Sequence, residues 1–266
     1  MKTAKPCASG CPAATLRRIA RRSRLDSLSC IGWLALALCS WLGVAAAQPP
    51  DLEGFWTVKF ESTPSGRALM EELPDDAILI DDTGGGELGL GEFAGLTLTA
   101  AAREDIRTYD YAAELRRENT CVPPSAAFYM QAPFPMEIYQ GTELIVFKVE
   151  YFDMYRVIFL DGRGPLPADA PHSKSGYSVG RWEGDTLVVE TTHLAAGTFM
   201  NNGLNHSDGL AMTERFRLSP DGTTLWATQL YEDSAIFAER AARYMAWTRV
   251  PGEHVFPYEC DASYGE

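Results

Sequence analysis

The sequence predicts an all-β fold with a minor α component, in which an antiparallel meander closes into a β-barrel. After Pro135, short runs rich in β-branched and aromatic residues alternate apolar and polar positions with period two. Turns built from Gly, Asp and Pro separate these runs, and strands do not alternate with helices as in a parallel sheet. We expect about nine strands, which avoid open edges most easily by closing into a ring.

The residues before Pro135 are expected to form one strand, a loop and one helix. The segment "DLEGFWTVKF" (51–60) alternates Trp56, Val58 and Phe60 with polar positions and predicts the first strand. Residues 61–97 are acidic and Gly-rich, and they predict a flexible loop with room for a short strand at "AILI". Residues 99–118 predict a helix, because they are rich in Ala, Arg and Glu and contain neither Gly nor Pro.

Three hairpins and two further strands are expected after Pro135. The hairpins are "MEIYQGTELIVFKVEYF", "YSVGRWEGDTLVVETT" and "MTERFRLSPDGTTLWATQLY". The run "MYRVIFLDG" follows the first hairpin, and "YMAWTRV" forms the last strand. The interior of a barrel of this size can hold a small apolar ligand.

Residues 1–47 resemble a secretory signal peptide. The first 25 residues carry seven Lys or Arg and no acid, and the apolar run "CIGWLALALCSWLGVAAA" then ends in small residues. We expect cleavage after Ala47, which leaves a single domain at 48–266. An uncleaved membrane anchor stays open as the alternative, since a run of about 17 apolar residues can just span a bilayer.

The composition narrows the classes of partner. The chain has 23 Lys and Arg against 36 Asp and Glu, a net charge of −13. Seven of the basic residues but only one acid fall in residues 1–47, so the remaining domain is still more acidic. Such a surface repels nucleic acid and anionic membranes. We therefore expect no nucleic-acid partner and no stable membrane insertion after signal cleavage.

Only two of the six cysteines, Cys121 and Cys260, lie outside the predicted signal peptide. Two cysteines in a secreted chain most simply form a disulfide. Two free thiols or a metal site are the alternatives, although the Cys and His spacing that a zinc site needs is absent. We expect no metal and no cofactor.

The stretch "GYSVG" fits the G-x-S-x-G pattern of a serine-hydrolase nucleophile elbow, with Ser178 at its centre. An elbow needs a strand, a sharp turn and then a helix. Here a Gly-Asp turn and a second strand follow instead, so we expect Ser178 to be a small residue within a strand. A serine hydrolase stays open as the alternative, since unrelated folds assemble catalytic triads from distant residues.

Polar side chains are concentrated in the loop "NNGLNHSDGL", which directly precedes a predicted strand. A loop of this composition is a plausible rim of a binding site. It can equally be a turn whose Asn and Asp side chains bond its own backbone. Its candidate residues are Asn201, Asn202, Asn205, His206 and Asp208.

The faces of two strands predict an ion pair inside the barrel. Glu214 shares a face with Met212 and Phe216, and Arg156 lies on the apolar face of "MYRVIFL". A buried carboxylate is costly unless a cation offsets the cost, so we expect Arg156 and Glu214 to pair. Such a pair can orient the polar end of a ligand, or it can only satisfy itself.

Several motifs together resemble a family of secreted bacterial proteins of uncharacterised function with a lipocalin-like β-rich domain. They are "DLEGFW", "CVPPSAAFYMQAPFPMEI", "YRVIFLDGRG", "YSVGRWEGDTLVVETTHL", "NNGLNHSDGLAMTERFRLSPDGTTL" and "VPGEHVFPYECD". The resemblance implies secretion, a lipocalin-like barrel and a cysteine pair at Cys121 and Cys260. It implies no activity. Members often have His after "DGR" and in "GHSVG", where this chain has Gly164 and Tyr177.

We therefore expect a secreted or periplasmic barrel that binds a small apolar or amphipathic molecule, with ample aromatic residues to line it. Its expected ligand contacts are Arg156, Asn201, Asn202 and Asn205. The alternative is an enzyme on the same barrel, of isomerase, cyclase or hydrolase type, doing acid–base chemistry with His206, Asp208 and Glu214. A third interpretation is a partner in envelope assembly.

Overall fold

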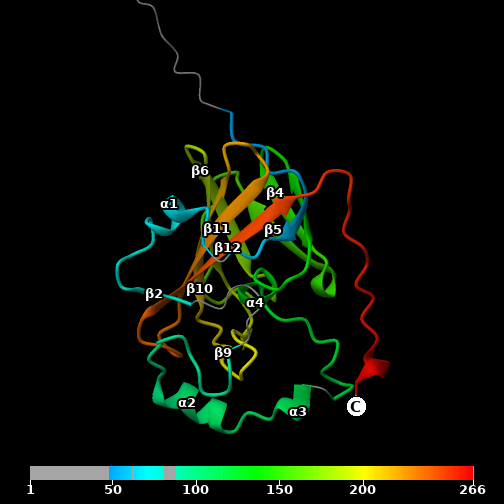
Figure 1. Ribbon diagram of the computed structural model, residues 1–266. Coiled ribbons are helices and arrows are strands. Elements are labelled where there is room, and N and C mark those ends of the chain that lie inside the picture. Colours follow the sequence, from blue (N-terminus) through cyan, green and yellow to red (C-terminus); the bar gives the residue numbers. More distant parts are fainter. Residues whose placement is uncertain (1–47, 62, 81–87, 115, 266) are drawn as a thin grey trace, which may run out of the picture. The chain divides into compact units, whose positions relative to one another are not determined.

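Nine strands close into a barrel, as the sequence predicts (Figure 1). The computed structural model describes residues 48–61, 63–80, 88–114 and 116–265, so the predicted signal peptide lies outside the described residues. Around the ring the strands are β1 (Gly54–Val58), β3 (Met136–Gln140), β4 (Leu144–Val149), β5 (Met154–Phe159), β6 (Tyr177–Glu183), β7 (Thr186–Thr192), β10 (Ala211–Leu218), β11 (Thr224–Glu232) and β12 (Arg240–Arg249). Pairing of β1 with β12 closes the ring.

The three predicted hairpins are confirmed as β3–β4, β6–β7 and β10–β11. Gly184 forms the β6–β7 turn with φ +64, a value that glycine adopts without strain. One ring pair departs from the predicted antiparallel meander, because β5 and β6 run parallel. Residues 160–176 return the chain to the other end of the barrel before β6 begins, as a parallel pair requires.

Alternation along the strands fills the barrel interior with side chains. On β10, Met212, Glu214 and Phe216 are at most 1% exposed, and the residues between them are partly exposed. Large apolar side chains from β1 and β12, including Trp56 and Trp247, complete this core. Burial of each such side chain contributes about 1.5–3 kcal/mol to the stability of the fold.

The single helix predicted over residues 99–118 is wrong in length. Instead α2 (Ala100–Arg107) ends before Thr108, and α3 (Tyr111–Glu114) is a separate turn. The hydroxyl of Thr108 donates to the carbonyl of Asp105 at 3.0 Å. Next to it Tyr109 packs so closely on Gly203 that a Cβ on that glycine would lie 2.6 Å from the tyrosine ring. This tertiary contact outweighs local helix propensity.

Part of the segment predicted as a flexible loop, 61–97, is structured. It contains α1 (Arg67–Met70) and the predicted short strand, β2 (Ala77–Leu79), which pairs parallel to β12 outside the ring. Residues 62 and 81–87 lie outside the described residues.

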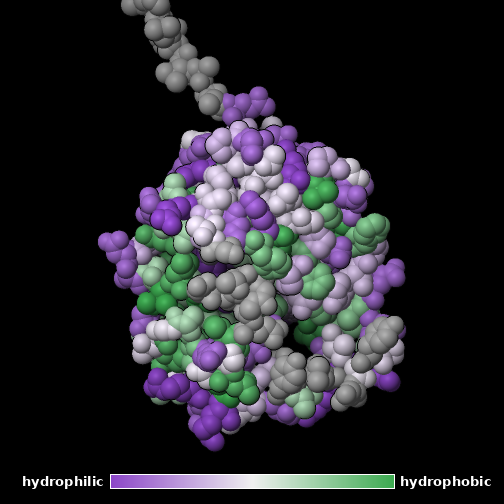
Figure 2. Space-filling model, in the orientation of Figure 1, coloured by the Kyte–Doolittle hydropathy of each residue, from purple (hydrophilic) through white to green (hydrophobic). Residues whose placement is uncertain are grey.

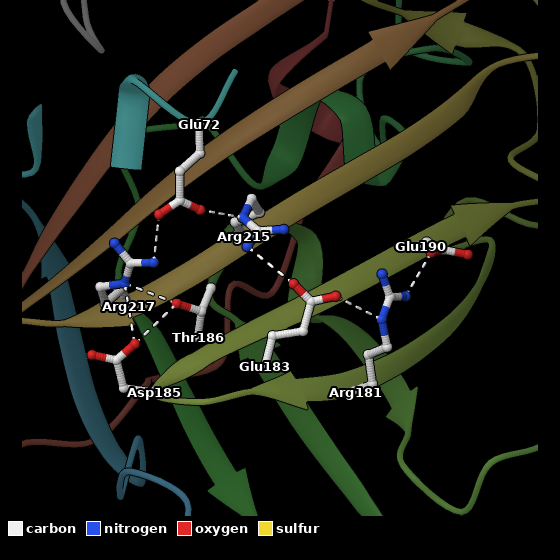
Figure 3. A network of polar contacts seen from close by, with 8 residues as sticks. All are labelled: Glu72, Arg181, Glu183, Asp185, Thr186, Glu190, Arg215 and Arg217. Carbon is white, nitrogen blue, oxygen red and sulfur yellow. Dashed lines mark hydrogen bonds and ion pairs between the residues drawn. The ribbon is translucent and has the colours of Figure 1, made fainter. Parts of the chain in front are cut away.

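A network of ion pairs lies on the outer faces of β6, β7 and β10 (Figure 3). It binds Glu72, which follows α1, to the barrel. Glu72 accepts from Arg215 Nε at 2.7 Å and from Arg217 Nη2 at 2.6 Å. The network continues through Glu183 and Arg181 to Glu190. Its side chains are partly exposed, so each pair contributes only about 0–1 kcal/mol.

The face of the molecule in Figure 2 is largely hydrophilic, and hydrophobic residues form smaller groups between the hydrophilic ones. None of the helices in the described part of the chain has the length and apolar composition that crossing a membrane requires.

The predicted disulfide is confirmed. Cys121 and Cys260 are bonded across a sequence separation of 139 residues. The bond ties the C-terminal tail to the loop that precedes α4 (Ala126–Tyr129).

Candidate functional site

One end of the barrel gathers the connections that carry most of the candidate residues. Here β4 turns into β5, the chain enters β6, and the long connection from β7 to β10 forms a small sheet of β8 (Gly197–Thr198) and β9 (Asn205–His206). The helix α4 covers this end, and its Ala126, Ala127 and Tyr129 are at most 1% exposed. Figure 1 shows β9, α2 and α3 in the lower part of the view, at this end.

A pocket of about 720 Å³ lies at this end and is called the end pocket below. Its apolar wall consists of Val122, Pro123, Pro124, Phe128, Tyr151 and Phe152. Its other lining residues are Asn119, Thr120, Lys174, Ala196, Gly197, Thr198, Asn201, Asn205, His206 and Gly265. A pocket with an apolar wall and a few polar groups suits a small amphipathic ligand.

The end pocket carries positive charge in a strongly acidic chain. Among the described residues Lys174 lines it, and no Asp or Glu does. The Lys174 ammonium donates to the carbonyl of Ala196 at 3.4 Å, and it forms no ion pair with a carboxylate of the described residues. The ammonium group is therefore available to an anion in the pocket.

His206 lines this pocket and is held between two hydrogen bonds. Its Nδ1 lies 2.7 Å from the carbonyl oxygen of Ser207, and its Nε2 lies 2.6 Å from the Ser125 hydroxyl. A carbonyl only accepts, so Nδ1 carries the proton. In the neutral ring Nε2 then accepts, and the Ser125 hydroxyl donates to it.

The surroundings of His206 favour the neutral ring. Burial lowers the pKa of His206 below its ordinary value of 6.5, and the charge of Lys174 acts in the same direction. The hydrogen bond to Ser207 and the carboxylate of Asp233 act against this shift without overcoming it.

Asp233 fixes the residue that orients the imidazole. Its carboxylate accepts from the Ser207 backbone N–H at 2.7 Å and from the Ser207 hydroxyl at 2.8 Å. Ser125, His206, Ser207 and Asp233 are called the end cluster below. All are at most partly exposed, and Ser125 and His206 are at most 1% exposed.

The loop residues singled out in the sequence divide between the pocket and the scaffold. Asn201 and Asn205 are exposed and line the end pocket. Asn202 is buried and donates to the carbonyl of Glu92 at 2.7 Å, so its side chain anchors the loop. Asp208 is exposed, and no hydrogen bond or ion pair joins it to His206 or Glu214. The structure thus does not bring the three candidate catalytic residues together.

Arg156 and Glu214 form the ion pair predicted inside the barrel, and both side chains are fully buried. Arg156 also donates to Ser178 at 3.1 Å and to Thr191 at 2.6 Å. Gln229 donates to the second Glu214 oxygen at 3.0 Å. These five residues are called the interior cluster below.

Ser178 lies within β6, as the strand interpretation predicts, and β7 follows the next turn. Its hydroxyl is buried between Arg156 and Thr191. The G-x-S-x-G match is therefore not a nucleophile elbow, because strand and not helix follows it.

A second pocket, of about 400 Å³, lies on the outer wall beside β1 and β3. Its charges are mixed, since it is lined by Arg249 and by Glu53, Glu137 and Glu253. His254 contacts Glu137 at 2.9 Å there. Of these two pockets, only the end pocket offers a cation without carboxylates.

Sequence reasoning missed Ser125, Lys174 and Asp233. Each stands outside the polar loop, and only the closed barrel brings them to His206. A weak signal was present at Ser125, since serine after Pro-Pro and before "AAFY" is typical of a helix start.

In the described part of the chain no three His, Cys, Asp or Glu side chains form a group that could hold a metal ion.

No protein-family model matches the chain, and no match was found among the curated proteins.

Proposed function

We propose that this protein is a secreted or periplasmic barrel that binds a small amphipathic molecule with an anionic head group in the end pocket. The observation that carries the proposal is the lining of the pocket, where the described residues combine an apolar wall with one lysine and no carboxylate side chain. In a chain with 13 more acidic than basic charges, such a lining favours an anion over a cation.

The two sides of the pocket suit two parts of one ligand. Phe128, Tyr151 and Phe152 offer aromatic surface to an apolar chain or ring. Lys174 supplies a charged donor for the head group, and Asn201 and Asn205 supply amide groups at the rim. A volume of about 720 Å³ is within the usual range for drug-sized ligands.

The proposal moves the ligand from the barrel interior, where it was expected, to the end of the barrel. The interior cluster and the large apolar side chains around it are at most 1% exposed, whereas Asn201 and Asn205 of the end pocket are exposed.

Secretion is supported by the disulfide, which persists in oxidising compartments.

Calorimetric titration with decanoate and with decanol, which share a chain length, tests the proposal. Decanoate is expected to bind more tightly than decanol, and Lys174→Gln is expected to weaken decanoate about tenfold or more, since a charged hydrogen bond contributes about 1.5–3 kcal/mol. Lys148→Gln is the matched control. Lys148 also donates to a backbone carbonyl at 3.4 Å, but it does not line the pocket.

Equal affinities for decanoate and decanol would contradict an anionic head group, as would equal losses in the two lysine variants. A second pair of variants changes the apolar wall at an exposed position, where a substitution does not disturb the core. Val122 is an exposed residue of the apolar wall, so Val122→Glu should weaken decanoate and Val122→Gln should do so much less.

A further inference from the structure

We propose that Ser125 is a nucleophile and His206 its general base, so that the end pocket hydrolyses esters of apolar carboxylic acids. The first support is the 2.6 Å hydrogen bond between the Ser125 hydroxyl and Nε2 of His206. The neutral ring, with its proton on Nδ1, directs the lone pair of Nε2 at that hydroxyl. Removal of a serine proton requires this arrangement.

The second support is that Ser125 does not use its hydroxyl for local structure. It occupies the N-cap position of α4, where a serine side chain normally accepts a hydrogen bond from a backbone N–H of the first turn. No such bond is made, and the hydroxyl points to His206 instead. A helix cap alone would not explain this choice of partner.

Asp233 completes the arrangement as a positioning residue. It holds Ser207 by two hydrogen bonds, and the Ser207 carbonyl fixes both the tautomer and the orientation of the imidazole. A buried carboxylate that acts through another group on the histidine is analogous in role to the acid of a catalytic triad.

Lys174 places positive charge on the same wall. A Cβ built on Gly197 would lie 3.4 Å from the Lys174 ammonium and 3.9 Å from Nε2 of His206. The two nitrogens therefore flank one point beside Gly197. An ammonium group at this position stabilises the negative charge that develops on a carbonyl oxygen under attack, and then the carboxylate product. This step rests on the proposed function, because the acyl chain occupies the same pocket.

Access to Ser125 runs past Phe128. Ser125 is fully buried, whereas Phe128, in the single turn of α4 that Ser125 precedes, is half-buried and lines the end pocket. Displacement of the Phe128 ring by the acyl group exposes the hydroxyl to the carbonyl carbon. Phe128 thus controls how fast Ser125 reacts.

The reaction balances without a cofactor. Ser125 Oγ forms a bond to the ester carbonyl carbon while its proton moves to Nε2 of His206. The carbon–oxygen bond to the alcohol breaks, and the alcohol leaves with that proton. Water then attacks the acyl-serine and gives a proton to His206. The bond from the acyl carbon to Ser125 Oγ breaks, His206 returns its proton to Oγ, and the carboxylic acid leaves and loses its own proton to solvent, so that ester and water yield acid and alcohol.

A decyl fluorophosphonate tests the nucleophile, since serine attack on phosphorus expels fluoride and leaves a stable adduct. Peptide mass spectrometry should find the adduct on Ser125. Labelling should disappear in Ser125→Ala, fall at least about 100-fold in His206→Gln, and become faster in Phe128→Ala. Ser178→Ala is the matched control, because it removes another buried serine outside the pocket and should leave labelling unchanged. Absence of the adduct from both the natural protein and Phe128→Ala would overturn the proposal, as would undiminished labelling in His206→Gln.

Hydrolysis of p-nitrophenyl decanoate gives the second readout, alongside decanoate binding measured on the same samples. Ser125→Ala should lose hydrolysis and retain decanoate binding, which also shows that the variant is folded. Decanoate binding without hydrolysis by the natural protein would overturn this inference and leave the proposed function standing. Labelling of Ser125 without decanoate binding would overturn the proposed function and leave Ser125 as a nucleophile.

Discussion

The interior cluster and the end cluster are both groups of buried polar residues in the same barrel, but only the end cluster borders a pocket. In the interior cluster a cation and an anion neutralise one another, and Ser178, Thr191 and Gln229 bond to the pair. In the end cluster the hydrogen bonds run from Asp233 through Ser207 and His206 to Ser125, no ion pair joins these four residues, and His206 is part of the pocket wall. Buried polar residues therefore indicate a site only where the cluster borders a space that a ligand can enter.

The difference predicts that the two clusters separate stability from function. Substitutions in the interior cluster should lower the free energy of unfolding and leave the chemistry of the end pocket unchanged. Substitutions in the end cluster should affect the pocket more than the fold. The outer ion pairs of Figure 3 provide the reference for charges that remain in contact with water.

The largest loss of stability is expected for Glu214→Ala. Removal of this carboxylate leaves Arg156 buried without its counterion, which costs about 3–5 kcal/mol. The matched outer substitution is Glu190→Ala, which breaks one exposed pair with Arg181 and should cost at most about 1 kcal/mol. Urea denaturation measures both. Similar losses for the two variants would mean that the interior pair is no more important than a surface pair.

Loss of the disulfide should come next. In the chain-entropy description, opening so long a loop lowers the free energy of unfolding by about 4–5 kcal/mol at most, and about 2–4 kcal/mol is typical. The double substitution Cys121→Ser with Cys260→Ser should also weaken decanoate binding severalfold, because Thr120 and Val122 of the pocket wall are the neighbours of Cys121, and Gly265 of the same wall belongs to the tail that Cys260 ties down. Unchanged decanoate affinity would show that this wall does not depend on the disulfide.

Ser178→Ala should have a smaller effect, and on stability alone. It removes the partner of Arg156 Nε and one partner of Thr191, which costs about 1–3 kcal/mol for groups left unsatisfied. Decanoate affinity and ester hydrolysis should not change. A loss of hydrolysis without a loss of stability would return Ser178 to the active site.

The smallest predicted effect is a dependence of stability on pH that comes from His206. Because the fold lowers the pKa of His206 below 6.5, the unfolded chain binds more protons once the pH falls below that value. The free energy of unfolding should therefore be highest above pH 6.5 and decrease as the pH falls to 5.5. His206→Gln should flatten this interval. Carboxylates such as Glu61, whose pKa the fold lowers from 4.5 to about 2, act at lower pH. If the free energy of unfolding of His206→Gln decreases as steeply with falling pH as that of the natural protein, groups other than His206 cause the decrease.

Local patterns predicted the barrel well because strand faces repeat every two residues. That periodicity alone predicts inward-facing side chains for Glu214 and Arg156, and the ion pair follows from their burial. It also separated Ser178 from a nucleophile elbow, because the turn residues after it predict another strand.

The predictions were weaker where distant parts of the chain meet. The helix over 99–118 ends early because Tyr109 packs on Gly203, a contact between segments almost a hundred residues apart. The end cluster joins Ser125, His206 and Asp233 from three connections at one end of the barrel. No local pattern encodes such a meeting, so the loop suggested His206 and Asp208 together although only His206 belongs to the cluster.

The most direct test of the central claim is to locate bound decanoate by NMR. Decanoate is titrated into uniformly ¹⁵N-labelled protein, and the shifts of backbone amides in the two clusters are compared. Binding in the end pocket should shift the amides of Gly197, Asn205 and His206, and it should leave those of Glu214 and Gln229 unchanged. Shifts concentrated at Glu214 and Gln229, with the amides of β8 and β9 unmoved, would place the ligand inside the barrel and contradict the account.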